Sequence, residues 1–156
     1  MKPDVIEATI REYIPQIIHM SLATVKDNKP WVCEVHFSYD DGLNLYFVSS
    51  QETRHAQELI ANPHVAGNIV TQHHKNQKVR CVDFEGIATM LEGKEAEATA
   101  YKAYVERYGV SEGLLNEIRK DGNTRFFKIA VDTFYLFDSY GDERGKHTLP
   151  WNGGNA

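Results

Sequence analysis

The sequence predicts an α+β fold in which about six antiparallel strands close into a small barrel with short flanking helices. Short apolar runs follow one another with only turns between them, whereas a parallel sheet needs a crossover, usually a helix, after each strand. Residues 31–39 place large apolar side chains at every second position, which is typical of a strand. Closing the sheet removes the unpaired edges that such hydrophobic strands would otherwise expose.

The first part of the chain reads as a helix followed by strands. Apolar residues recur at helical spacing from Val5 to Ile14, and Pro15 ends or kinks that helix. Turns rich in Asp, Asn, Gly and Pro then separate three runs, which we expect to form a meander. These runs are residues 17–25, 31–39 and 43–49.

The rest of the chain adds three strands and three helical segments. A helix is expected at 53–61, where Asn62 and Pro63 stop it. Further strands are expected at 65–71, 78–91 and the strongly aromatic 125–140. Helical segments are expected at 94–108 and 111–119. Residues 1–156 are therefore expected to form one domain, in which 141–156 are a partly irregular tail.

The composition limits the function classes. The chain carries a formal net charge of −5 at pH 7, which argues against a broad surface for nucleic acid or an anionic membrane. No apolar stretch approaches the ~20 residues that span a bilayer, and the N-terminus lacks the layout of a signal peptide. We therefore expect a cytoplasmic protein that binds neither nucleic acid nor membrane.

Neither the cysteines nor the adjacent histidines form a metal-binding pattern. Cys33 and Cys81 lie far apart in strand-like runs and are expected to be small buried side chains. His73 and His74 fall in a polar turn, and adjacent side chains of this kind point in different directions. We expect no metal site.

The turn after the third strand combines several groups suited to an anion. A strand-like run ends in two serines, and the following helix opens with Thr53, Arg54 and His55. A helix N-terminus presents unpaired backbone N–H groups and the positive end of the helix dipole, which suit a phosphate. The alternative is an ordinary capped helix, since Ser49 and Glu52 also have the spacing of a capping box.

Two segments, and the order of the elements around them, carry a family resemblance. They are SSQETRHAQELIANPHVAGNIV, at 49–70, and VDFEGIATMLEG, at 82–93. Together with the preceding helix and strands, they resemble the pyridoxamine 5′-phosphate oxidase-like split barrel. The likeness covers about residues 14–91 and is closest to a branch of small bacterial proteins without an assigned activity. It implies a six-stranded antiparallel split β-barrel.

The resemblance implies that FMN binds in a groove between the two protomers of a homodimer. In this fold a Ser/Thr-Arg/Lys-Lys triplet holds the flavin phosphate, and it corresponds here to Thr53, Arg54 and His55. Arg54 keeps the forked, charged donor, while His55 stands in place of lysine and carries only part of a charge at neutral pH. The isoalloxazine is expected along the second and third strands, against Val32, Cys33, Glu34, Val35, Val48 and Ser49.

Other positions depart from the pattern of the true oxidases. Glu34 lies near the place of an arginine in their second-strand flavin motif, and residues 144–147 lack their Arg-x-His spacing for the substrate phosphate. The sequence also shows no side-chain catalytic constellation, which fits a protein whose flavin does the chemistry. We therefore expect an FMN-dependent oxidoreductase of undefined substrate and electron donor, and not a pyridoxamine phosphate oxidase.

Two other functions stay open. One is a homodimer that binds flavin, or another planar cofactor, without turnover; for haem, the candidate axial ligands are His19, His36, His55 and His64. The other is a structural homodimer that has lost its cofactor, to which the departures at Glu34 and His55 point. Trp151 is a lone large apolar residue in a polar tail, and we expect it to dock on another surface such as the partner subunit.

Overall fold

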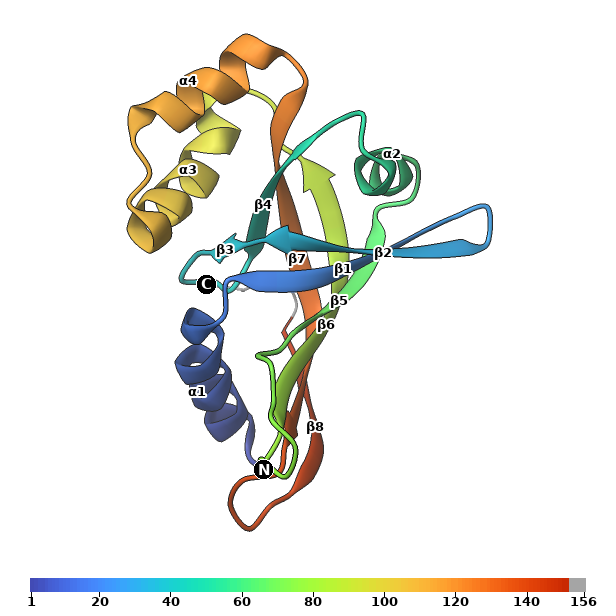
Figure 1. Cartoon of the computed structure of the whole chain (residues 1–156), viewed down its shortest axis with the longest axis vertical. Coiled ribbons are helices and arrows are strands. Elements are labelled where there is room, and N and C mark those ends of the chain that lie inside the picture. The colour runs from blue at the N-terminus through green and yellow to red at the C-terminus, as the bar shows by residue number, and fades with distance from the viewer. Residues whose placement is uncertain (152–156) are drawn as a thin grey trace.

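The computed structural model describes residues 1–151, which form a curled antiparallel half-barrel with helices around it (Figure 1). The helices are α1 (Pro3–Tyr13), α2 (Arg54–Ala61), α3 (Lys94–Tyr108) and α4 (Glu112–Asp121), and a 3-10 turn, η1 (Ile14–Gln16), follows α1. The strands are β1 (His19–Lys26), β2 (Lys29–His36), β3 (Ser38–Tyr39), β4 (Leu45–Ser50), β5 (His64–Ile69), β6 (Arg80–Met90), β7 (Thr124–Asp138) and β8 (Gly145–Pro150). The predicted α+β class is confirmed.

The strands form one sheet in the order β2-β1-β5-β6-β7-β4-β3, with β8 paired to β7 beside this path. Within residues 1–151 the sheet has eight strands, so the prediction of six is wrong. One extra strand arises because the run at 31–39 breaks at Phe37, a fully buried residue whose N–H donates to Ile18 O. Before the break β2 pairs with β1, and after it β3 pairs with β4. The other extra strand is β8.

The third predicted strand pairs with only the last two residues of the second. On its other side β4 pairs over its whole length with β7, in a register that sets Phe47 opposite Phe127. Both side chains are fully buried, and their rings stack with centroids 4.9 Å apart and planes 8° apart. Cross-strand aromatic pairs stabilise strand pairing and help to fix its register. The aromatic residues of β7 therefore select a distant partner strand.

The tail returns to the sheet. β8 pairs with the second half of β7, so part of the segment predicted to be irregular is a strand. Trp151, which follows β8, packs against the core of its own chain: its Nε1 donates to Gly42 O at 2.8 Å, and its ring centroid lies 6.0 Å from that of Phe134. Trp151 therefore docks as expected, and the surface that it contacts belongs to its own chain. The end of the predicted tail, 152–156, lies outside the described residues.

Two groups of buried side chains hold the elements together. The main core lies inside the curled sheet, and α1 closes one side of it with Ile6, Ile10 and Tyr13. The second group lies under α3 and α4 and includes Tyr104 and Phe126. It seats these two helices against β3 and β7. Within residues 1–151, no helix has the length and apolar character needed to cross a membrane.

β1 and β2 form a hairpin that projects beyond the rest of the sheet (Figure 1). At its tip, Asp27 and Asn28 have φ angles of 50° and 60°, the left-handed values that a tight two-residue hairpin turn requires. β2 is an edge strand, and most of its side chains are exposed, including Trp31 and Val32. The hairpin therefore presents two exposed large apolar side chains, Trp31 and Val32, on a strand with one unpaired edge.

Candidate functional site

The turn between β4 and α2 gathers two hydroxyl groups and an imidazole. Ser49 Oγ lies 3.1 Å from Thr53 Oγ1 and 2.8 Å from His55 Nε2, and Thr53 Oγ1 lies 3.2 Å from the same nitrogen. Thr53 caps α2, because its Oγ1 accepts a hydrogen bond from Ala56 N. The helix is thus capped by Thr53 and not by the box of Ser49 and Glu52, and the Ser49 hydroxyl is turned to the imidazole.

His55 is half-buried beside the ring of Phe47. Burial lowers the pKa of its imidazole below the ordinary value of 6.5, and the nearby Glu58 carboxylate offsets part of this effect. The ring is therefore mainly neutral at pH 7 and carries less charge than the triplet pattern requires. A neutral imidazole can donate or accept a hydrogen bond and can ligate a metal ion.

Arg54 is directed to the β1–β2 hairpin. Its Cζ lies 4.1 Å from the ring centroid of Trp31, and its Nε donates to Glu58 Oε1 at 2.7 Å. The other Glu58 oxygen accepts a hydrogen bond from Thr24 Oγ1 at 2.6 Å, and the bonds from Thr24 and Arg54 together lower the pKa of this carboxyl. Within residues 1–151, only Nε of this half-exposed guanidinium has a hydrogen-bond partner. The terminal nitrogens of Arg54 therefore stay available to a ligand.

A pocket of about 420 Å³ is lined by residues of β2, β4, α2, α3 and α4. This volume falls within the range of small-molecule sites. Five of the nine predicted site residues line it, namely Glu34, Val35, Val48, Ser49 and His55. Thr53 joins its edge through the contacts with Ser49 and His55 described above. The two strands and the helix start that the resemblance singles out do meet at one pocket.

Three predicted residues lie outside the lining of this pocket. Val32 is 60% exposed, and Cys33 packs against the main core, where burial raises the pKa of its thiol. Arg54 is held against the hairpin by Trp31 and Glu58. Val32 and Cys33 lie outside the lining because the first part of β2 belongs to the projecting hairpin. Only its last residues, from Glu34 on, reach the pocket.

Sequence reasoning did not assign His36, Tyr104 or Leu114 to the flavin site, yet all three line the pocket. His36 shares a strand face with Glu34, so the period-two spacing could have indicated it. Tyr104, on α3, donates a hydrogen bond to His36 O at 3.3 Å, and burial raises the pKa of its hydroxyl. No local pattern indicates that α3 and α4 cover this end of the sheet, because their packing joins distant segments.

Two of the four candidate haem ligands, His36 and His55, line the same pocket. His19 contacts His36 across the β1–β2 pair, with ring centroids 4.5 Å apart. His64 lies elsewhere, in a pocket beside the start of β5. Among residues 1–151, no three His, Cys, Asp or Glu side chains come together as a metal site of their own. The pocket therefore offers imidazoles to a cofactor.

Sequence comparison assigns the family. The family model described as pyridoxamine 5′-phosphate oxidase matches residues 6–138, a range that contains all nine predicted site residues. This chain belongs to the pyridoxamine 5′-phosphate oxidase family. One of its curated relatives is the UPF0306 protein YhbP from Salmonella paratyphi A, which is 35% identical over 106 residues, or 62% of this chain and 71% of the relative. The resemblance drawn from the sequence is confirmed.

Solved structures show the same split-barrel fold outside close relatives. The haem-binding protein from Mycobacterium smegmatis has a TM-score of 0.70 and 17% identity, across 90% of this chain and 56% of that protein. The haem storage protein HutZ from Vibrio cholerae has a TM-score of 0.65 and 21% identity, across 83% and 89% of the two chains. At these identities the likeness establishes the fold alone. The pyridoxamine 5′-phosphate oxidase family fold thus accommodates proteins named for haem as well as for pyridoxamine phosphate.

Proposed function

We propose that this protein binds FMN between two copies of the chain and acts as a flavin-dependent oxidoreductase. One observation carries the proposal: the Ser49–Thr53–His55 cluster borders a pocket whose walls are the two strands expected to contact the isoalloxazine. Membership of the family supports the choice of cofactor. When bound, FMN supplies the hydride or electron transfer, and the protein supplies position and electrostatics.

The side chains of the turn are suited to holding a phosphate. The terminal nitrogens of Arg54 provide charged donors in a fork that matches phosphate oxygens. Ser49 adds a hydroxyl group beside the start of α2, next to Thr53, whose own hydroxyl donates to Ser50 O at 2.9 Å. Because the His55 imidazole is mainly neutral, Arg54 is the principal charge of this site, and Glu58 fixes its direction. This set fits an FMN phosphate with less total charge than a triplet containing lysine.

The apolar edge of β2 supports a homodimer. Trp31 is 40% and Val32 60% exposed, and the outer edge of β2 is unpaired within residues 1–151. An exposed, apolar edge strand favours association with another chain. We therefore propose that a second copy covers this hairpin and supplies the other wall of the cofactor groove. Trp31 also contacts Arg54, so the hairpin links dimer formation to the phosphate site.

The tail argues against pyridoxamine phosphate as the substrate. Lys146 Nζ pairs with Asp83 Oδ2 at 2.9 Å, and His147 Nε2 lies 2.9 Å from Glu143 O. Both residues lie on β8, which the ribbon shows far from α2 and the pocket-covering α3–α4 pair (Figure 1). Between residue 141 and the last described residue, 151, the C-terminal segment therefore brings no cationic pair to the pocket within one protomer, and we propose a different substrate.

Titration of FMN fluorescence with purified protein tests the proposal. We expect Arg54→Ala to weaken FMN binding by about tenfold or more, since a hydrogen bond to a charged group contributes about 1.5–3 kcal/mol. Arg144→Ala is the matched control, because that exposed arginine lies in the β7–β8 turn and its Nε donates only to Gly141 O. Unchanged FMN affinity in Arg54→Ala, with an intact circular dichroism spectrum, would refute the phosphate site.

Catalysis and assembly need separate measurements. Bleaching of the flavin absorption by NADH or NADPH under anaerobic conditions would support an oxidoreductase, whereas a flavin that stays oxidised with both donors would favour a carrier. Sedimentation should show a dimer at micromolar protein, and Val32→Asp should dissociate it because a carboxylate would replace an apolar contact. A wild-type monomer under these conditions would contradict the two-protomer groove.

Haem binding without turnover is the second candidate. The observation that favours it is the placement of His36 and His55 on one pocket, with His55 held neutral by burial. Hemin titration should then give a sharp Soret band that weakens in His36→Ala or His55→Ala. His64→Ala is the control, because His64 lies outside the pocket. Equal Soret bands in all three variants would exclude these histidines as ligands.

A further inference from the structure

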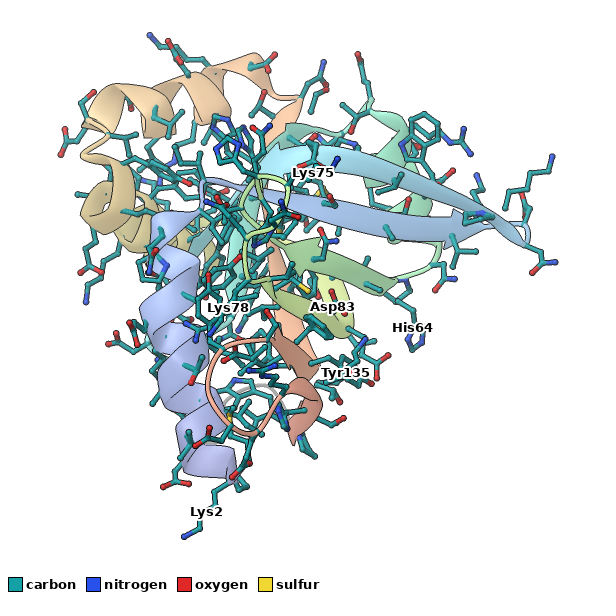
Figure 2. The ribbon with its side chains drawn as sticks, turned by 60° about the horizontal axis from the view of Figure 1, so that its bottom comes forward. Lys2, His64, Lys75, Lys78, Asp83 and Tyr135 are labelled. Atoms are coloured by element: carbon teal, nitrogen blue, oxygen red, sulfur yellow. The ribbon has the colours of Figure 1, made fainter. Side chains whose placement is uncertain are left out.

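A second pocket, of about 470 Å³, lies between the end of α1, the turn at 70–79 and the end of β7. It shares no residue with the cofactor pocket. The residues that define its character are Tyr13, Gln77, Lys78, Arg80 and Tyr140, with Glu12 at its margin. Figure 2 labels Lys78 on this turn. It also labels Lys75, which lies apart from Lys78 and comes earlier in the same turn.

The floor of this second pocket is held in place by one tyrosine. Tyr13 is 6% exposed, and its hydroxyl donates to Arg80 O at 2.6 Å while accepting a hydrogen bond from Thr71 N at 3.2 Å. These two bonds join α1 to the beginning of the turn, at Thr71, and to the first residue of β6, Arg80. Burial raises the pKa of this hydroxyl, so Tyr13 stays neutral and does not repel an anion. The pocket is therefore preformed at its base.

Two cationic side chains, Lys78 and Arg80, line this pocket although the whole chain is acidic. Arg80 Nη2 pairs with Asp138 Oδ2 at 3.0 Å, but Arg80 Nε is buried without a hydrogen-bond partner among the described residues. Lys78 takes part in none of the ion pairs of residues 1–151. Both cations lie against Tyr140, with Lys78 Nζ 5.5 Å and Arg80 Cζ 4.9 Å from its ring centroid. Glu12 is the single carboxylate of the lining.

We propose that this second pocket binds the phosphate group of a small phosphorylated ligand. Lys78 supplies a charged donor, and the guanidinium of Arg80, which also lines the pocket, adds a second positive charge. The side-chain amide of Gln77 adds a neutral donor, since only its Oε1 is used, by His74 N. The ring of Tyr140 provides an apolar surface for the organic part of the ligand. This site is independent of the flavin or haem pocket.

Calorimetric titration with phenyl phosphate tests the inference, because this probe carries both a phosphate and an aromatic ring. Lys78→Gln should raise the Kd by about tenfold or more. Lys75→Gln, the matched control from the same turn, should leave the Kd nearly unchanged because Lys75 does not line the pocket. Tyr140→Leu should weaken phenyl phosphate more than inorganic phosphate.

Three results would overturn the inference, and the affinity for the cofactor separates this phosphate site from the proposed cofactor site. Wild-type protein that binds no phenyl phosphate at millimolar concentration would overturn it, and so would equal losses in Lys78→Gln and Lys75→Gln. Phenyl phosphate binding that is lost in Arg54→Ala but kept in Lys78→Gln would place the anion at the α2 turn instead. FMN or hemin affinity should be the same in Lys78→Gln and in the wild type, whichever cofactor the protein binds.

Discussion

Replacing Gly86 by alanine probes a close approach of two backbones in the sheet. Gly86 lies where the register of β6 and β7 shifts, and an added Cβ would overlap Ala130 O and lie 3.0 Å from both Ala130 C and Val131 Cα. Those atoms are backbone and cannot rotate away. Overpacking against such fixed atoms lies in the upper part of its range, about 2–3 kcal/mol, and replacing a strand glycine by alanine returns about 1 kcal/mol of backbone entropy. We expect a net destabilisation of about 1–2 kcal/mol.

Thermal unfolding followed by circular dichroism measures this effect. For a chain of this length 1 kcal/mol corresponds to about 2–4 °C, so the Tm of Gly86→Ala should fall by about 2–8 °C. Gly113→Ala is the matched control: it lies in the first turn of α4, where an added Cβ would meet only the rotatable Ser111 Oγ at 3.2 Å. Alanine is favoured in helices, so the control should keep or raise the Tm. A Tm of Gly86→Ala equal to that of the wild type would refute the close approach.

Three further substitutions test packing and protonation. Phe127→Ala should lower the free energy of unfolding by about 3–5 kcal/mol in urea, because its buried ring stacks on Phe47; a loss below about 1 kcal/mol would contradict that packing. His55→Gln should flatten the dependence of stability on pH. Because the folded-state pKa of His55 is lowered, the wild type is most stable above pH 6.5 and loses stability as the pH falls from there toward the lowered pKa, so an unchanged slope in the variant would argue against its burial. Trp151→Phe should cost about 1 kcal/mol in urea through loss of the bond to Gly42 O, and full wild-type stability would show that this bond contributes nothing.

Local patterns predicted most helices and strands of the described residues. The apolar spacing of Ile6 and Ile10 identifies the buried face of α1, and the Ala- and Glu-rich run gives α3 with its observed bounds, Lys94–Tyr108. The start of α2 was also found, although Thr53 caps it instead of Ser49. These features depend on residues that are only a few positions apart, so the sequence indicates them directly.

Pairings between distant segments could not be predicted in the same way. The main partner of β4 is β7, because Phe47 stacks on Phe127 across the sheet. Nothing near β4 in the sequence indicates this pairing. Tyr104 reaches the pocket only through the packing of α3, and Trp151 returns to the core only because β8 pairs with β7. Thus the wall of the site made by β2, β4 and the start of α2 could be predicted from the sequence. The wall made by α3 and α4 could not.

β7 shares its two edges among three strands. β6 runs along one edge, and the other edge is divided between β4, up to Ile129, and β8, from Thr133. A ribosome makes β4 and β6 well before β7, so the growing chain carries strands that lack their partner until residue 138 has emerged. Such unpaired edges promote aggregation, and pairings between distant segments form slowly. The half-barrel therefore closes only after β7 has been made, and chains cut short before β7 should require chaperones to stay dispersed.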